Sequence, residues 1–211
     1  MNKKCIIISA SDFYGLNSPI NEGDYVIAAD AGYKHCLEIG VKPDLIIGDF
    51  DSYGKRPDFE NIIQMPVEKD DTDTMHCVRV GIEKGFTEFE IYGGTGGKRA
   101  DHTIANIQSL LYMAVNGAEG VMYGKSQMYR VIHNKTVCYP DTCKGDLSIF
   151  CLDGKAERVT LKGLKYEIEN YTLTSYFPIG CSNSFIGKEA TISVENGNLI
   201  LIHDIFKVNN V

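Results

Sequence analysis

The amino-acid sequence predicts an α/β N-terminal domain with a mostly parallel sheet flanked by helices, followed by an all-β sandwich or barrel domain. In the first part of the chain, continuous apolar runs alternate with segments of helical periodicity, as in parallel sheets buried on both faces. Farther along, the runs are short, often alternate between apolar and polar residues, and show no good helical pattern. The length of 211 residues suits two small domains, which we place at residues 1–128 and 129–211.

The segments of the N-terminal domain follow from local pattern and from the residues that stop each run. Strand segments are short, with continuous apolar runs in 4–10 and 25–30, whereas helical segments repeat apolar residues at helical spacing. Gly40 and Gly85 end the first two helices, since glycine commonly occupies the position after a helix. In chain order we expect a strand at 4–10, a strand at 25–30, a helix at 31–41, a strand at 44–49, a helix at 74–86, a strand at 88–94, a helix at 101–118 and a strand at 120–124.

The two longer helices are expected to bury one apolar face each. Residues three or four positions apart lie on the same side of a helix. The expected faces are Met75, Val78 and Ile82 in the helix at 74–86, and Ile104, Ile107 and Leu111 in the helix at 101–118.

The C-terminal domain is interpreted as short strands separated by turn residues. Alternation of apolar and polar residues is typical of antiparallel sheets with one face in the core. Asn196 and Gly197 give the strongest local signal, because this pair favours the tight turn of a two-residue hairpin. The expected strands lie at 129–134, 135–140, 147–152, 156–163, 165–174, 189–195 and 198–206.

Charge and hydropathy exclude several classes of function. The net charge of -7 argues against general nucleic-acid binding, which needs a basic surface to displace counterions. No apolar run approaches the roughly 20 residues that span a bilayer, so no membrane contact is expected. The run Cys5–Ile8 is shorter than the roughly 7–15 residues of a secretory signal core and is interpreted as a first strand, which indicates a cytoplasmic protein.

The seven cysteines are expected to be reduced and mostly buried. Their number is odd, no C-x-x-C pair occurs, and several stand inside apolar runs. Neither a disulfide framework nor a structural zinc site is therefore indicated. The alternative is a bridge between Cys138 and Cys143 on oxidation, since these residues flank a Pro-Asp turn.

Aspartates gather where the apolar runs end. Asp30 follows one strand, Asp49 and Asp51 follow another, and the segment KDDTD at 69–73 precedes a helix. Ligands of open α/β sheets bind beyond the carboxyl ends of the strands, so these carboxylates are expected at one edge. Asp49 and Asp51 are two residues apart in an extended segment and point the same way, and carboxylate oxygens suit Mg²⁺. We therefore assign Asp49, Asp51 and Asp73 to a magnesium site.

Other aspartates have a simpler interpretation as helix caps or turn formers. This structural role is preferred for Asp44, Asp58 and Asp70. The role of Asp71 stays open between the site and the start of the next helix, because Thr72 and Asp73 are equally suited to cap that helix.

The segment YGGTGGKRADH at 92–102 is the candidate phosphate loop. Its glycines let backbone N–H groups approach an anion, and Lys98 and Arg99 add positive charge, the arginine as a fork that holds two phosphate oxygens. The segment matches neither the P-loop nor the G-x-G-x-x-G pattern, so its position between a strand and a helix carries the interpretation. The alternative is a mobile hairpin-like loop. His102, beside Asp101 at the helix start, is expected to line the site, and the remaining histidines are interpreted as surface or structural residues.

The stretch LIIGDFDS at 45–52 also resembles the D-x-D loop of haloacid-dehalogenase-type phosphatases, in which the first aspartate is a nucleophile. In those enzymes the loop usually follows the N-terminal strand and continues with Thr or Val. Here it follows a third strand and ends in Ser52. A metal-holding role for both aspartates is therefore preferred over a nucleophilic one.

Taken in order along the chain, these motifs resemble those of the thiamine pyrophosphokinase family. The matching stretches are AADAG at 28–32, KPDLIIGDFDS at 42–52, KDDTD at 69–73, GGTGGKRADHTIAN at 93–106, GLKYEI at 163–168 and GCSNSF at 180–185. Each stretch alone is weak, but their order and spacing cover nearly the whole chain. The resemblance implies a catalytic α/β domain, a thiamine-binding β-sandwich and a homodimer. It also implies Mg²⁺-dependent transfer of a pyrophosphoryl group from ATP to the hydroxyl of thiamine, giving thiamine diphosphate and AMP.

The resemblance assigns roles to residues at matching positions. The catalytic set is Asp49, Asp51, Asp73, Arg99 and Asp101. The nucleotide set is Asp30, Asp71, Thr72, Gly94, Thr95, Gly96, Lys98, Arg99 and Asn106. For thiamine, Tyr166 is implied as an aromatic wall and Ser182 and Asn183 as polar contacts, although pattern alone favours Tyr166 as a half-buried strand residue.

One departure and two alternatives remain at this stage. Ala31 and Tyr33, around Gly32, stand where the family commonly has Gly-Gly-Ala, which weakens the nucleotide role of Asp30. The alternatives are a metal-dependent nucleotide hydrolase or phosphatase and a non-catalytic sensor of thiamine or a nucleotide. The full set of carboxylates with Arg99 argues against a sensor, and the GLKY and SN stretches argue against a plain hydrolase.

Overall fold

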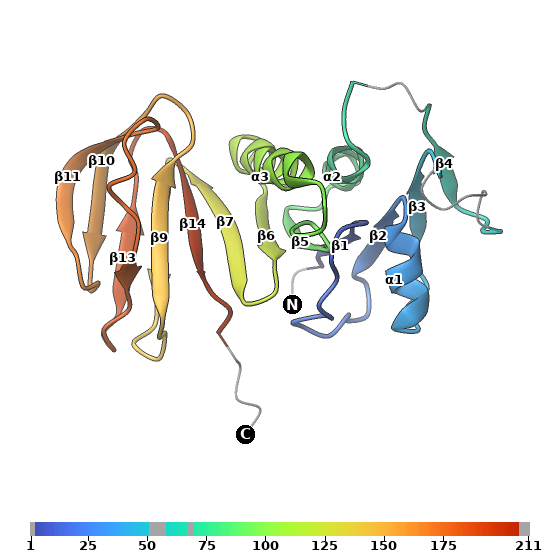
Figure 1. The fold of residues 1–211 in the computed structure, drawn as a ribbon, viewed down its shortest axis with the longest axis horizontal. Coiled ribbons are helices and arrows are strands. Elements are labelled where there is room, and N and C mark those ends of the chain that lie inside the picture. Colours follow the sequence, from blue (N-terminus) through green and yellow to red (C-terminus); the bar gives the residue numbers. More distant parts are fainter. Residues whose placement is uncertain (1–2, 51–57, 67–69, 207–211) are drawn as a thin grey trace. The chain divides into compact units, whose positions relative to one another are not determined.

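A computed structural model of the chain describes residues 3–50, 58–66 and 70–206 and divides it into two compact units, Met1–Lys125 and Ser126–Val211. The first unit is α/β and the second is all-β, in agreement with the predicted fold class (Figure 1). Within the described residues, no helix is both long and apolar enough to cross a membrane.

The first unit is built on a parallel sheet with the strand order β6-β5-β1-β2-β3-β4. Its strands are β1 (Cys5–Ile8), β2 (Tyr25–Ala29), β3 (Leu45–Gly48), β4 (Ile62–Gln64), β5 (Glu88–Tyr92) and β6 (Glu119–Tyr123). In the centre of the sheet, Ile7 lies between Ile27 and Ile91, and none of the three is exposed. Their complete burial explains why the runs that form β1, β2 and β3 are apolar at every position rather than at alternate ones.

Helices cover both faces of this sheet (Figure 1). They are α1 (Gly32–Glu38), α2 (Asp73–Glu83) and α3 (Ala100–Val115). Cys36 of α1 packs in one core cluster with Ile6 and Ile8. Gly81 of α2 lies against Cys5 instead, since a Cβ atom at Gly81 would stand 3.1 Å from the Cys5 Sγ. Because successive strand residues point to opposite faces, α1 and α2 cover opposite sides of the sheet.

The buried face of α3 differs from the predicted one. Ile104 is 62% exposed, so its assignment to the core was wrong, and Ile107 and Leu111 are only half-buried. The buried residues of α3 are Asn106, Ser109, Leu110 and Met113. The face is rotated because Asn106 turns inward to hydrogen-bond a loop of the site, a polar contact that hydrophobic periodicity does not register.

The second unit consists of two antiparallel sheets, ordered β12-β9-β14-β7 and β11-β10-β13-β8. The strands are β7 (Gln127–His133), β8 (Thr136–Tyr139), β9 (Asp146–Cys151), β10 (Lys155–Lys162), β11 (Ile168–Thr174), β12 (Asn183–Ser184), β13 (Ala190–Ser193) and β14 (Asn198–Asp204). Both sheets contribute to a single hydrophobic core, with Leu147 and Leu199 from the first sheet and Val159 and Ile192 from the second.

The predicted tight hairpin at Asn196 and Gly197 was wrong. The pair joins β13 to β14, and these strands belong to different sheets. Gly197 adopts a φ of 120°, and its N–H donates to the Asn134 side-chain oxygen at 2.8 Å. The turn is therefore tied to the end of β7 and carries the chain from one sheet to the other.

All seven cysteines are unbridged and five are buried, which confirms the prediction of reduced, mostly buried thiols. Burial raises the pKa of Cys5 and of Cys36 to about 12. These thiols stay protonated at neutral pH and behave as small apolar residues of the core.

His203 on β14 links the stability of the second unit to pH. Its side chain is 1% exposed, its Nδ1 donates to the Asp204 carbonyl at 2.7 Å, and its Nε2 is buried without a hydrogen-bond partner. Burial lowers the pKa of His203 below its ordinary value of 6.5. The unfolded chain therefore takes up this proton more readily than the folded one, so the stabilisation is complete above pH 6.5 and is lost as the pH falls below it.

We expect the melting temperature of the native protein to fall more steeply than that of His203→Gln when the pH is lowered from about 7 to about 5. Thermal unfolding of both proteins across this range measures the difference. Parallel pH profiles for the two proteins would contradict the assignment.

Candidate active site

A cleft of about 460 Å³ opens in the first unit where its strands end. Its walls come from the residues after β1, β2 and β3 and from the first turns of α2 and α3. The lining residues are Ser9, Ala10, Ser11, Ala29, Asp30, Asp49, Asp71, Thr72, Asp73, Thr74, Arg99, His102 and Asn106. The cleft lies at the carboxyl edge of the parallel sheet, which is where open α/β sheets bind ligands.

Asp30 is held at the floor of the cleft in an unusual backbone conformation. Its φ of 47° is left-handed, and its N–H donates to the Ile47 carbonyl at 2.7 Å. Gly48 permits this close approach, because a Cβ atom there would stand 2.8 Å from the Asp30 Cα. Asp30 is 8% exposed and its Oδ1 is buried without a hydrogen-bond partner. A buried carboxylate oxygen without a donor favours a ligand that supplies a cation or a donor group.

The start of α2 brings three residues of the KDDTD segment to the cleft. Thr72 is the N-cap, and its side-chain oxygen accepts the Met75 N–H at 3.1 Å. Asp73 is the first helical residue, and Asp71 pairs with Arg79 at 3.2 Å. The capping role that the sequence left open therefore belongs to Thr72, and Asp73 remains at a helix N-terminus, where a carboxylate is stabilised by the helix dipole.

The residues 93–97, here called the glycine loop, follow β5 and lead into α3. Gly93, Gly96 and Gly97 all adopt positive φ, which L-residues with side chains rarely tolerate. The Asn106 side-chain amide, on α3, donates to the Gly94 carbonyl at 2.8 Å. Thr95 is buried, whereas Lys98 beyond the loop is exposed. Of the predicted phosphate-binding residues, the structure brings Arg99 and Asn106 to the cleft, while Gly94, Thr95, Gly96 and Lys98 are not among its lining.

Arg99 and Asp101 form a forked ion pair at the start of α3. Arg99 Nε donates to Asp101 Oδ1 at 3.0 Å, and its Nη2 donates to Asp101 Oδ2 at 2.7 Å. The hydrogen bond from Arg99 holds the pKa of Asp101 at about 2. Arg99 lines the cleft and Asp101 does not. Both side chains are more than half exposed, so the guanidinium is available to exchange this carboxylate for another oxyanion.

A divalent cation was predicted at Asp49, Asp51 and Asp73. Asp49 and Asp73 both line the cleft, and Asp51 lies outside the described residues. In the part of the chain that the structure describes, no three acidic, histidine or cysteine side chains are gathered around one point. Mg²⁺ usually takes one or two carboxylates and completes its shell with water and phosphate oxygens. The oxygen-only donor set and the unpartnered Oδ1 of Asp30 fit such an ion.

In the second unit, Asn183 fixes the backbone of Tyr166. Its Oδ1 accepts the Tyr166 N–H at 2.9 Å, and its Nδ2 donates to the Tyr166 carbonyl at 2.7 Å. Asn183 is 4% exposed, so its amide is a buried clamp, whereas the Tyr166 ring is 57% exposed. Ser182 adopts a φ of 60°, and its N–H donates to Ser148 Oγ at 3.1 Å. Tyr166, Ser182 and Asn183 thus form one local unit in which the Tyr166 ring is exposed.

Several lining residues were not identified from the sequence. Ser9 and Thr74 are buried at the cleft, and their hydroxyl oxygens lie 2.8 Å apart, joining the end of β1 to the first turn of α2. Ser11 continues the same wall. The rule that placed Asp30 and Asp49 at strand ends applies equally to the SAS stretch after β1, so the signal was present but carried no charge to mark it.

Comparison with known proteins gives matches over both units. Residues 16–122 match the family described as "Thiamin pyrophosphokinase, catalytic domain", and residues 136–199 match "Thiamin pyrophosphokinase, vitamin B1 binding domain". The chain is 30% identical over 190 residues to thiamine pyrophosphokinase of Bacillus subtilis, covering 83% of this chain and 85% of that protein. It is 29% identical over 178 residues to thiamin pyrophosphokinase 1 of Caenorhabditis elegans, covering 77% and 72%.

Solved structures are similar over almost the entire chain. The crystal structure of thiamine pyrophosphokinase from Bacillus subtilis aligns with a TM-score of 0.85 at 26% identity, covering 96% of this chain and 99% of that one. A thiamin pyrophosphokinase family protein from Enterococcus faecalis aligns with a TM-score of 0.80 at 26% identity, covering 98% and 100%. The arrangement of elements described above is therefore shared with these proteins.

Proposed function

The chain belongs to the thiamin pyrophosphokinase family, and from this premise we propose how its own residues carry out the reaction. The enzyme transfers a pyrophosphoryl group from ATP to the hydroxyl of thiamine, giving thiamine diphosphate and AMP. The observation that carries the assignment of the site is the cleft at the strand ends, which combines Asp30, Asp49, Asp73 and Arg99 in one place.

We propose that the cleft holds the ATP phosphates together with Mg²⁺. Asp49, Asp51 and Asp73 would hold the ion, and Asp30 with its unpartnered Oδ1 would serve the nucleotide side of the cleft. When bound, Mg²⁺ supplies neutralisation of phosphate charge that a cleft lined with carboxylates does not provide by itself. Ala31 and Tyr33 follow Asp30 in place of smaller family residues, so the nucleotide contacts there are expected to be specific to this chain.

In phosphoryl-group transfer, the protein contributes mainly by positioning the reacting groups and by stabilising charge. Arg99 is the residue that stabilises the charge developing on the phosphates, and Lys98 assists from the exposed side of the loop. Asp101 keeps the guanidinium of Arg99 oriented until substrate arrives. The hydroxyl of thiamine attacks the β-phosphorus in line and AMP leaves. Asp71 lines the cleft without a proposed metal role, and it is preferred over Asp73 as acceptor of the hydroxyl proton.

For thiamine, we propose the exposed ring of Tyr166 as the wall that faces the cationic thiazolium. An aromatic face attracts a cation through its quadrupole. Asn183 acts by fixing the Tyr166 backbone, and Ser182 supplies a polar contact next to it. The proposed assembly is a cytoplasmic homodimer with a catalytic domain at 1–128 and a thiamine-binding β-sandwich at 129–211.

Tyr166→Ala is expected to raise the KM for thiamine by about 3–30-fold, which corresponds to the loss of one cation–π contact. The KM for ATP should stay within about twofold, because the phosphate cleft belongs to the first unit. Tyr166→Trp is the matched variant that keeps an aromatic face. Steady-state kinetics with each substrate varied in turn give both values, and an unchanged KM for thiamine in Tyr166→Ala would remove this residue from the pocket.

The function is tested by incubating the protein with Mg²⁺, ATP and thiamine and separating the products. Formation of AMP with an equal amount of thiamine diphosphate, only when thiamine is present, is the expected result. Release of ADP or free phosphate at a rate that thiamine does not change would instead indicate a nucleotide hydrolase. Binding of thiamine or ATP without any product would indicate a sensor.

A further inference from the structure

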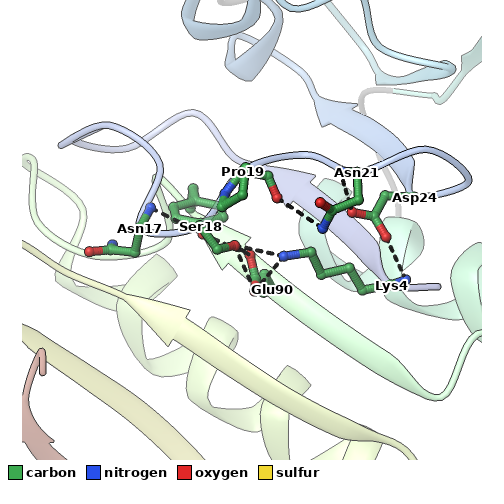
Figure 2. A network of polar contacts seen from close by, with 8 residues as sticks. Lys4, Asn17, Ser18, Pro19, Asn21, Asp24 and Glu90 are labelled. Atoms are coloured by element: carbon green, nitrogen blue, oxygen red, sulfur yellow. Dashed lines mark hydrogen bonds and ion pairs between the residues drawn. The ribbon is translucent and has the colours of Figure 1, made fainter. Parts of the chain in front are cut away.

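The segment 9–24 joins β1 to β2 and is here called the strap, because it is fastened along β5 at two separate places. Its middle is held by a polar network around Glu90 (Figure 2). Lys4 Nζ lies 2.9 Å from Glu90 Oε1 and 2.6 Å from Ser18 Oγ, and Ser18 Oγ donates to Glu90 Oε2 at 2.9 Å. Tyr92 OH donates to the same carboxylate at 2.7 Å, and it accepts the Asn17 N–H at 3.3 Å.

This network is partly buried, so its polar contacts are little weakened by solvent. The side chains of Lys4 and Glu90 are 14% and 15% exposed, so their ion pair is shielded from solvent. Burial, followed by the charge of Glu90, raises the pKa of Tyr92, which keeps its hydroxyl a donor at all working pH values. The middle of the strap is thus tied to the strand that leads directly into the glycine loop.

The near end of the strap runs beside that loop. Ser9 N–H donates to the Tyr92 carbonyl at 2.8 Å, and Ser11 N–H donates to the Gly93 carbonyl at 2.9 Å. His35 Nε2 lies 3.0 Å from the Ser11 carbonyl oxygen, which connects the strap to α1 as well. These contacts leave the next residue, Asp12, directly against the glycine loop.

Asp12 holds the loop through its carboxylate. The Gly97 N–H donates to Asp12 Oδ2 at 2.9 Å, and the Tyr14 hydroxyl donates to the same oxygen at 3.1 Å. A Cβ atom at Gly96 would stand 2.7 Å from Asp12 Oδ2, so the carboxylate fits closely over a position that only glycine allows. Gly96 and Gly97 have φ values of 82° and 68°, and because glycine loses much conformational freedom on ordering, the contact with Asp12 helps to hold them in one conformation.

The position of Asp12 relative to the cleft distinguishes two roles, competition with phosphate and support of the glycine loop. A carboxylate inside the cleft would compete with phosphates for the loop and repel them. The strap residues that line the cleft are Ser9, Ala10 and Ser11, and Asp12 is not among them. Asp12 therefore contacts the loop from outside the cleft, where it fixes the backbone without occupying the space for phosphate.

We propose that Asp12 is a positioning residue, which holds the glycine loop so that Arg99, two residues beyond Gly97, reaches the ATP phosphates. This inference rests on the proposed use of the cleft for ATP. Asp12 itself touches neither substrate. Its effect passes through the Gly97 N–H, so it depends on an acceptor oxygen at this position and not on the negative charge.

The test compares Asp12→Ala with Asp12→Asn, which removes the charge but keeps an acceptor oxygen. Glu22→Ala, an exposed carboxylate in the same strap, is the matched control. In Asp12→Ala, amide hydrogen exchange of peptides covering residues 93–99 should accelerate by about 3–10-fold, as expected for the loss of one hydrogen bond. The KM for ATP should rise and kcat should fall, each by a similar factor, because Arg99 contacts the ATP phosphates and stabilises the charge that develops on them. The KM for thiamine should stay unchanged. Asp12→Asn and Glu22→Ala should resemble the native protein in both measurements.

Unchanged exchange and unchanged KM for ATP in Asp12→Ala would overturn the proposal. So would tighter ATP binding in both Asp12 variants, because it would show that the carboxylate competes with phosphate. An Asp12→Asn variant as impaired as Asp12→Ala would overturn the hydrogen-bond account. Hydrogen exchange is measured without substrate, so a native protein that forms no thiamine diphosphate would refute the proposed function while the exchange data still decide whether Asp12 holds the loop.

Discussion

Asp73→Asn is expected to lower kcat by about 10²–10³-fold, the loss typical of removing one electrostatic contact to the reacting groups. Asp73 lines the cleft at the first position of α2, and the amide that replaces it is a much poorer partner for a divalent cation. The fold should survive, because the helix keeps its cap at Thr72. The loss of a negative charge at the helix N-terminus destabilises by about 0.3–2 kcal/mol.

The matched control for this change is Asp70→Asn. It makes the same chemical replacement in the same segment, but Asp70 is exposed and does not line the cleft. Its kcat should stay within about twofold of the native value. Initial rates over a titration of Mg²⁺ compare the two variants. A near-normal rate for Asp73→Asn at saturating Mg²⁺ would remove Asp73 from the metal site.

Arg99→Gln is expected to reduce kcat by about 10²–10³-fold as well, for a different reason. The guanidinium supplies a rigid fork of donors that matches phosphate oxygens, and glutamine supplies neither the charge nor the fork. In the structure this fork pairs with Asp101, whose pKa is held at about 2. Asp101 is therefore ionised at every working pH, and the pairing does not contribute to the pH profile of the reaction above about pH 4.

Arg158→Gln provides a control that separates this effect from the general loss of a surface ion pair. Arg158 pairs with Glu195 at 2.8 Å with a similar exposure, but it belongs to the second unit. Its replacement should leave kcat unchanged, while Arg99→Lys should recover part of the activity by restoring the charge without the fork. Equal rates for Arg99→Gln and the native protein would show that the charge of the transferred group is stabilised elsewhere.

Much of the first unit followed from the sequence because its physical signals are local. Strands buried on both faces must be apolar throughout, so β1, β2 and β3 were visible as continuous runs, whereas β5 alternates glutamate with apolar residues. The three residues of β4 give too short a run to be recognised, and they become a strand only by pairing with β3. The face of α3 was misjudged because Asn106 is buried for a hydrogen bond to the glycine loop rather than for its hydrophobicity.

The second unit shows the same limit in its turns. An Asn-Gly pair favours a tight hairpin only when both flanking strands belong to one sheet, and sheet membership is decided by contacts distant in sequence. Gly197 instead bonds Asn134, which lies far earlier in the chain. The short pairing of β12 with β9 depends in the same way on distant partners.

For the site, the charged residues around the cleft were predictable, whereas the hydrogen bonds that support them were not. Asp30 and Asp49 line one cleft because parallel strands end at one edge, and Arg99 joins them from the start of α3. The Ser9–Thr74 hydroxyl contact, the Asp12–Gly97 hydrogen bond and the clamp of Asn183 on Tyr166 each join residues that no periodicity connects. Such contacts are set by the tertiary fold, so local sequence patterns do not predict them.

The central claim is that this cleft moves two phosphoryl groups together from ATP to thiamine. The most direct measurement follows ATP radiolabelled at either the α- or the γ-phosphate in a reaction with Mg²⁺ and thiamine. The account predicts that the γ-label appears in thiamine diphosphate and that the α-label stays in AMP, in equal amounts and only when thiamine is present. Appearance of the γ-label in thiamine monophosphate or in free phosphate, with ADP as the nucleotide product, would contradict it.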